Sequence, residues 1–148
     1  MNQTLSLGWT QAEARSRKLT YQRILRVTLA AEAVIGLAAL VAPGWFSSLF
    51  AMPTVEEIPA STAWARSWGL LLVLFAVFQV PALREPIRHR FGNVVGIVGR
   101  ILLGLFYLLM GASAATGLLW LALLEGGLGV ALVILYFGLF RAELMSRP

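Results

Sequence analysis

The most constraining feature of this sequence is an apolar segment from Gly92 to Met110, GNVVGIVGRILLGLFYLLM, with an arginine near its middle. A helix of about 20 apolar residues is long enough to cross the hydrocarbon core of a bilayer. The one charged side chain of the segment, Arg100, keeps its proton in proteins and is costly to expose to lipid. We therefore expect Arg100 to face other helices and to have an acidic partner inside a helical bundle.

Composition indicates a membrane protein. Of its 148 residues, 59% are hydrophobic and 13% are charged, and the mean hydropathy is +0.79. Soluble domains are about 45–50% apolar and about 25% charged. Four apolar segments fit membrane spans, at about residues 24–42, 63–83, 92–110 and 118–140. The sequence thus predicts an all-α, polytopic protein with a bundle of four transmembrane helices.

The basic residues outside the spans predict the topology. They are concentrated at the N-terminus, in the connection at residues 84–91 and in the C-terminal tail, whereas the connections at residues 43–62 and 111–117 contain neither lysine nor arginine. Because cytoplasmic loops are enriched in basic residues, both termini are expected in the cytoplasm, and the net charge of +5 needs no nucleic-acid surface. Short connections favour antiparallel packing of consecutive helices. The expected layout is a basic segment at 1–23, a transmembrane domain at 24–140 and a cytoplasmic tail at 141–148.

Several chemistries are excluded by side-chain content. The chain has no cysteine, which excludes disulfides, thiolate nucleophiles, iron–sulfur clusters and Cys-ligated zinc. Its single histidine, His89, lies in the charged connection, so the chain alone cannot supply two histidines to a membrane haem or three to a metal. No nucleophile is placed near a base. We expect no catalytic residue, no metal and no intrinsic cofactor.

Five polar side chains of the predicted spans are the candidates for buried ion pairs or a ligand site: Glu32, Arg66, Gln79, Arg100 and Glu125. With a rise of about 1.5 Å per residue, Glu32 and Arg100 each lie about 10 Å from the cytoplasmic ends of their spans. Glu125 lies about 10 Å from the opposite surface, at which Arg66 enters the second span. These depths predict two ion pairs between helices, Glu32 with Arg100 and Glu125 with Arg66, and Gln79 is deep enough to join the first.

Small and aromatic residues predict helix contacts and membrane interfaces. Close helix packing is expected at six glycines, Gly36, Gly96, Gly99, Gly104, Gly126 and Gly127. Tryptophans at the ends of spans favour the membrane–water interface. Three fit this position: Trp45, in a short interfacial turn of helix after the first span, and Trp64 and Trp68, at the start of the second.

The buried charges have three possible roles. The pairs can hold the helices in register as polar contacts. An arginine and a carboxylate at the bottom of an apolar cleft can instead bind the head of a quinone, a lipid or another apolar ligand. As a third role, Glu32 can carry a proton in transport.

The order of features resembles the DoxX-like group of small four-span bacterial membrane proteins. The resemblance lies in a first span that ends at Pro43 before WFSSLF, a second that begins ARSWG, the REPIRHR connection and a glycine-rich third span. That group includes small subunits associated with quinone-linked oxidoreductases. The resemblance implies a non-catalytic accessory or assembly subunit of a complex in the bacterial inner membrane. Implied partners are lipids, other membrane subunits or a second copy, and a bound lipid or quinone is the implied ligand.

A second resemblance concerns the first span alone. LAAEAVIG, from Leu29 to Gly36, is similar to the glutamate motif of small multidrug-resistance transporters, which implies a proton and cation site at Glu32. The spacing after the glutamate is one residue longer here, and Arg100 has no counterpart in those transporters. The alternative function is a binder or proton-coupled carrier of an apolar or cationic small molecule that uses Glu32 and Arg100.

Overall fold

The computed structural model describes residues 2–51, 60–113 and 116–146, and in these ranges all regular secondary structure is α-helical. These ranges contain five helices, α1 (Asn2–Val41), α2 (Pro43–Leu49), α3 (Ser61–Arg84), α4 (Arg90–Ser113) and α5 (Leu118–Met145). Four segments are long and apolar enough to cross a membrane, namely Gln11–Val41, Ser61–Arg84, Arg90–Ala112 and Leu118–Met145. The predicted all-α class and the four apolar spans are therefore confirmed.

Prolines mark where the helices end. Pro43 follows α1 and opens α2, where its missing N–H is not needed, so the short helical turn predicted around Trp45 is present. Pro81 lies inside α3, which continues to Arg84. The next residue, Glu85, precedes Pro86 and leaves the helical conformation (φ −136°, ψ 83°). Away from these prolines the helices run beyond the predicted spans, and α1 joins the basic N-terminal segment to the first span without a break.

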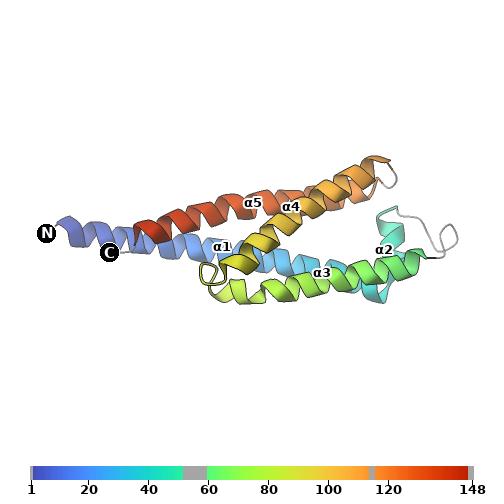
Figure 1. The fold of residues 1–148 in the computed structure, drawn as a ribbon, viewed down its shortest axis with the longest axis horizontal. Coiled ribbons are helices and arrows are strands. Elements are labelled where there is room, and N and C mark those ends of the chain that lie inside the picture. The colour runs from blue at the N-terminus through green and yellow to red at the C-terminus, as the bar shows by residue number, and fades with distance from the viewer. Residues whose placement is uncertain (1, 52–59, 114–115, 147–148) are drawn as a thin grey trace.

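The four long helices pack as two pairs. α1 packs most extensively on α3, and α4 on α5, while α1 and α5 join the two pairs (Figure 1). Among the long helices that pack directly on one another, α3 and α4 share the smallest contact, although only a short connection separates them. Because α1 and α4 each pack against α3 and α5, they lie diagonally across the bundle. Figure 1 also shows the start of α1 and the end of α5 at one end of the molecule, and α2 at the other.

Glycines allow the helices of each pair to approach closely. A Cβ atom on Gly36 of α1 would lie 2.8 Å from the carbonyl oxygen of Gly69 on α3. A Cβ atom on Gly104 of α4 would lie 2.8 Å from the Cα atom of Gly126 on α5. Backbones that approach this closely gain van der Waals contact, which drives helix association in membranes.

Two apolar clusters fill the interior. The first contains Tyr21, Leu25, Leu29, Ala76, Ala82, Ile97, Leu132 and Leu139. The second contains Ala39, Phe46, Tyr107, Leu121 and Ala122. Along α1, α4 and α5, the polar residues Glu32, Arg100 and Glu125 each fall between a member of the first cluster and a member of the second. The charged side chains therefore form a layer within an apolar core.

Candidate functional site

Each long helix contributes one polar side chain to a buried site, which we call the charge cluster. Its members are Glu32 of α1, Gln79 of α3, Arg100 of α4 and Glu125 of α5. These residues are 0%, 1%, 0% and 2% exposed, respectively. Among the described residues, Arg100 is the largest side chain that is fully buried. A charge enclosed in this way must be neutralised by its neighbours.

The guanidinium of Arg100 contacts side chains of α1 and α3 and a carbonyl group of its own helix. Its Nη2 lies 2.7 Å from Oε2 of Glu32 in a buried ion pair. Its Nη1 donates hydrogen bonds to Oε1 of Gln79 at 2.6 Å and to the carbonyl oxygen of Gly96 at 3.1 Å. Helical side chains lean toward the N-terminus of their helix, which explains the contact with Gly96, four residues earlier. The predicted pair of Glu32 with Arg100 is present, and it joins diagonally opposed helices.

Glycines on α4 make room for the α3 side chains that surround Arg100. A Cβ atom on Gly96 would overlap the amide group of Gln79, and one on Gly99 would lie 2.6 Å from Cζ of Phe75. The Phe75 ring centroid lies 5.5 Å from Cζ of Arg100, within the range of a cation–π contact. The glycine spacing of α4 therefore brings both the amide and the aromatic ring to the guanidinium.

Glu125 gives the charge cluster a second carboxylate. Its Oε2 lies 4.0 Å from Nε of Arg100, and both of these buried atoms lack a hydrogen-bond partner. Two carboxylates thus share a single guanidinium, so the cluster has a formal charge of −1 when both are ionised. A net charge is costly in the interior of a membrane protein. One added proton would make the charge cluster neutral.

The predicted pair of Glu125 with Arg66 is wrong. Arg66 is exposed near the start of α3, and Glu125 lies beside Arg100 instead. Gln79 follows Arg66 by 13 residues (79 − 66), which is about 20 Å along a helix. Since Gln79 is at the level of Arg100, Arg66 is too far away to reach the layer that contains Glu125. The sequence prediction counts the depth of Glu32 from the cytoplasmic end of its span and that of Glu125 from the opposite end of its span. It therefore assigns the two carboxylates to different layers.

Five of the six predicted packing glycines lie at close contacts. Gly36, Gly96, Gly99 and Gly104 have no room for a side chain, and the backbone of Gly126 touches Gly104. Gly127 differs, because it is exposed and a Cβ atom there would meet nothing within 4 Å.

Two glycines outside these six also lie at close contacts that bear on the site. They are Gly69, which meets Gly36, and Gly129, where a Cβ atom would lie 3.3 Å from that of Arg100. Gly129 lies four residues after Glu125 and shares its helix face, whereas Gly127 lies on the opposite side. The spacing from Glu125 therefore distinguishes Gly129 from Gly127.

The three tryptophans have different surroundings. Trp45 and Trp64 are 59% and 66% exposed, as expected for side chains at the surface of a span. Trp68 is half-buried, and its Nε1 donates a 2.7 Å hydrogen bond to the hydroxyl of Tyr107 on α4. Its ring also packs against Phe46 of α2, with centroids 5.2 Å apart. Trp68 therefore holds α2, α3 and α4 together.

A second buried polar link was not predicted. The hydroxyl of Tyr21 on α1 donates a 2.8 Å hydrogen bond to Oδ1 of Asn93 on α4. Nδ2 of Asn93 donates in turn to the carbonyl oxygen of Pro86 at 2.9 Å. Gln22 also donates to the carbonyl oxygens of Leu83 and Arg84, at 2.8 and 2.9 Å. The connection between α3 and α4 is thereby fixed against α1.

The chain matches no model of a protein family, no curated protein and no solved structure. Among the side chains that the structure describes, no three His, Asp or Glu residues group as a metal site would require. The fold and the charge cluster themselves indicate the class of protein. The chain is a multi-pass helical protein with four apolar spans and a buried ion pair between them.

Proposed function

We propose that this chain is a non-catalytic protein of the bacterial inner membrane that serves as an accessory or assembly subunit of a larger membrane complex. In this proposal its four spans are antiparallel and both termini are cytoplasmic, as the distribution of basic residues predicts. The DoxX-like order of features favours a quinone-linked redox complex as the larger assembly.

One observation carries the proposal: the charge cluster is enclosed, while the middle of each long helix exposes apolar side chains. Val34, Leu71, Leu102 and Leu123, one from each helix, are between 60% and 68% exposed. A bundle with its polar groups inside offers its surroundings mainly lateral, apolar contacts. Such a surface suits association with other membrane helices, because membrane helices associate largely through van der Waals packing.

The charge cluster supports this role by fixing the bundle. Arg100 lies within 4.0 Å of acidic groups on α1 and α5 and donates to Gln79 on α3, so one side chain connects all four helices. Polar contacts between membrane helices contribute roughly 0.6 kcal/mol on average and up to about 1.7 kcal/mol. A bundle held in one register presents a constant outer surface to a partner.

Site-specific photo-crosslinking in native membranes tests the proposal. A photoreactive residue at Leu123, on the outer face of α5, should yield a cross-link to one defined membrane protein. The same group at Leu132 of α5, which is 0% exposed, is the matched control and should give no such product. If reactive groups at Val34, Leu71, Leu102 and Leu123 all label lipid alone, and the chain purifies alone in mild detergent, the subunit proposal is wrong.

A second candidate function is favoured by the imbalance of charge in the cluster. Two carboxylates beside one guanidinium provide a place for one proton, as a proton-coupled carrier of an apolar cation would need. Vesicles that contain the protein and a pH-sensitive dye should then show proton movement when a lipophilic phosphonium cation is added. Glu125→Gln should abolish this movement and Glu13→Gln, outside the cluster, should preserve it. No cation-dependent movement with the wild-type protein would reject the carrier.

A further inference from the structure

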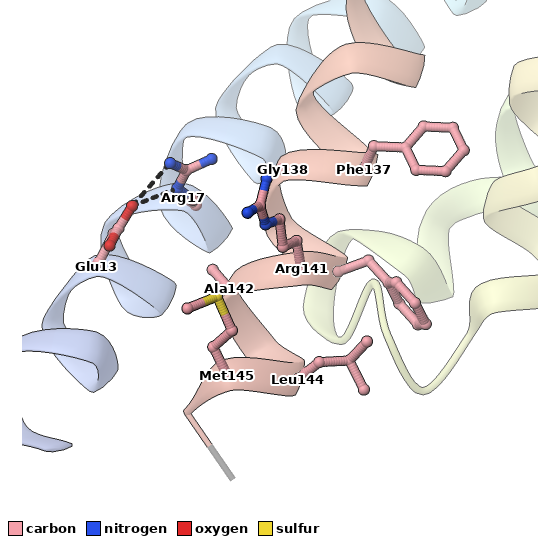
Figure 2. A pocket seen from close by; sticks show the side chains of 9 residues that line it. Glu13, Arg17, Phe137, Gly138, Arg141, Ala142, Leu144 and Met145 are labelled. Atoms are coloured by element: carbon pink, nitrogen blue, oxygen red, sulfur yellow. Dashed lines mark hydrogen bonds and ion pairs between the residues drawn. The ribbon is translucent and has the colours of Figure 1, made fainter.

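A groove separate from the charge cluster lies between the N-terminal half of α1 and the last turns of α5 (Figure 2). Its volume is about 730 Å³. Arg17 and Arg141 line it from the two helices, together with apolar side chains that include Phe137, Leu144 and Met145. Figure 2 shows the guanidinium groups of both arginines directed toward the same region beside Gly138.

Helix length places this groove at the level of lipid headgroups. α5 has 28 residues and is therefore about 42 Å long, compared with about 30 Å for the hydrocarbon core. About eight residues must extend beyond the core. The excess belongs to the C-terminal end, because α5 begins with the apolar run LLWLALL and carries Arg141 and Glu143 near its end. The segment of α5 that lines the groove, 137–145, thus leaves the hydrocarbon where phosphates begin.

The groove combines positive charge with exposed apolar surface. Arg17 forms an ion pair with Glu13, in which Nη2 of Arg17 lies 2.7 Å from Oε1 of Glu13. A Cβ atom on Gly138 would lie 2.8 Å from Nη1 of Arg17. The glycine therefore leaves space for the guanidinium against α5. Arg141 adds a second guanidinium on the opposite wall, so the groove carries a net formal charge of +1. Phe137 and Met145 are 69% and 61% exposed beside these charges.

We propose that this groove binds the phosphate of an anionic phospholipid, with Arg17 and Arg141 as its ligands. The planar guanidinium fork matches phosphate oxygens, and basic pockets between helices at the membrane surface attract anionic headgroups. The exposed Phe137 side chain, one turn closer to the hydrocarbon than Arg141, provides apolar surface for an acyl chain. A free phosphate or phosphate monoester shares the headgroup chemistry but would leave this apolar surface uncovered.

Native mass spectrometry of the full chain, titrated with phosphatidylglycerol or with phosphatidylcholine, tests this site. The double variant Arg17→Gln/Arg141→Gln should bind phosphatidylglycerol about thirtyfold more weakly, because each basic residue near an anionic surface contributes about 1 kcal/mol. The matched control is Arg15→Gln/Arg88→Gln, which removes two exposed arginines outside the groove. Arg15 lies about 200° around α1 from Arg17. This control should bind like the wild type.

Two further measurements keep the proposal testable if the double variant fails to accumulate. Glu13→Gln removes the carboxylate that competes for Arg17, so phosphatidylglycerol should bind more tightly. Soluble glycerol phosphate should not displace the lipid at matched concentration, and displacement would assign the site to a free phosphate instead. Equal binding of phosphatidylglycerol and phosphatidylcholine, or equal loss in the control and groove variants, would overturn the proposal.

Discussion

Arg100 and Glu32 form an ion pair across the diagonal of the bundle, with 2.7 Å between Nη2 and Oε2 and neither side chain exposed. Their helices, α4 and α1, each pack on α3 and α5 instead of on one another. The pair therefore spans the middle of the protein and depends on the placement of all four long helices. Its loss should affect the whole fold.

We expect Arg100→Gln to destabilise the protein strongly. The variant leaves Glu32 and Glu125 buried without a positive partner, and removal of one member of a buried pair typically costs about 3–5 kcal/mol. Unfolding in mixed micelles, followed by circular dichroism, measures the effect. Arg66→Gln is the control, because exposed arginines contribute within about 0.5 kcal/mol.

The reciprocal exchange tests the pairing itself. Glu32→Arg places two positive charges together and should prevent accumulation in the membrane, while combination with Arg100→Glu should restore part of it. Immunoblots of membrane fractions report the amount of protein. Equal accumulation of Glu32→Arg with and without Arg100→Glu would show that the two residues do not depend on each other.

The two glutamates should respond differently to the loss of their charge. Glu125→Gln removes the carboxylate farther from Arg100 and makes the charge cluster neutral, so thermal stability should be unchanged or higher. Glu32→Gln removes the closer carboxylate and should lower stability by roughly 1.5–3 kcal/mol, the usual contribution of a contact to a charged group. Melting temperatures in one detergent compare the two variants. A larger loss for Glu125→Gln would reverse the assignment of the principal partner.

A methyl group on α4 should disturb the charge cluster without altering any charge. In Gly96→Ala the new Cβ atom would overlap the Gln79 amide, which accepts a hydrogen bond from Arg100. Overpacking of this kind typically costs about 1–3 kcal/mol. Gly127→Ala is the matched control, because a Cβ atom at this position meets nothing within 4 Å and alanine is the better helix former. Equal melting temperatures for the two variants would contradict the proposed fit between Gly96 and Gln79.

The sequence predicted the spans and the principal pair because both follow from one strong constraint. Apolar runs of membrane length are easily recognised, and a buried arginine requires a nearby carboxylate. The partner of Glu125 could not be predicted, since it depends on how far each helix extends past the hydrocarbon. For two residues of α5, by contrast, helix periodicity does carry the signal. Gly127 and Gly129 are equally plausible packing residues by residue type, and the helix face on which each lies distinguishes them.

Polar contacts outside the charge cluster escaped prediction for another reason. Tyrosine and tryptophan are enriched near membrane interfaces, so Tyr21 and Trp68 needed no specific partner to explain their positions. In the structure, Asn93 links Tyr21 to the connection between α3 and α4, and Trp68 bonds to Tyr107. These pairings join residues far apart in the chain, and their register depends on the packing of α1 with α3 and of α3 with α4.

Tyr21→Phe should loosen the connection between α3 and α4 while it preserves the apolar core. The variant removes the hydroxyl that donates to Asn93 and leaves a buried acceptor unsatisfied, at a cost of about 1–3 kcal/mol. Amide hydrogen exchange in the connection, residues 85–89, should become faster than in the wild type. Tyr136→Phe is the control, because that ring packs against Tyr21, with centroids 5.6 Å apart, and the substitution keeps the ring contact. If the two variants show equal exchange in the connection, the Tyr21 hydroxyl does not hold it in place.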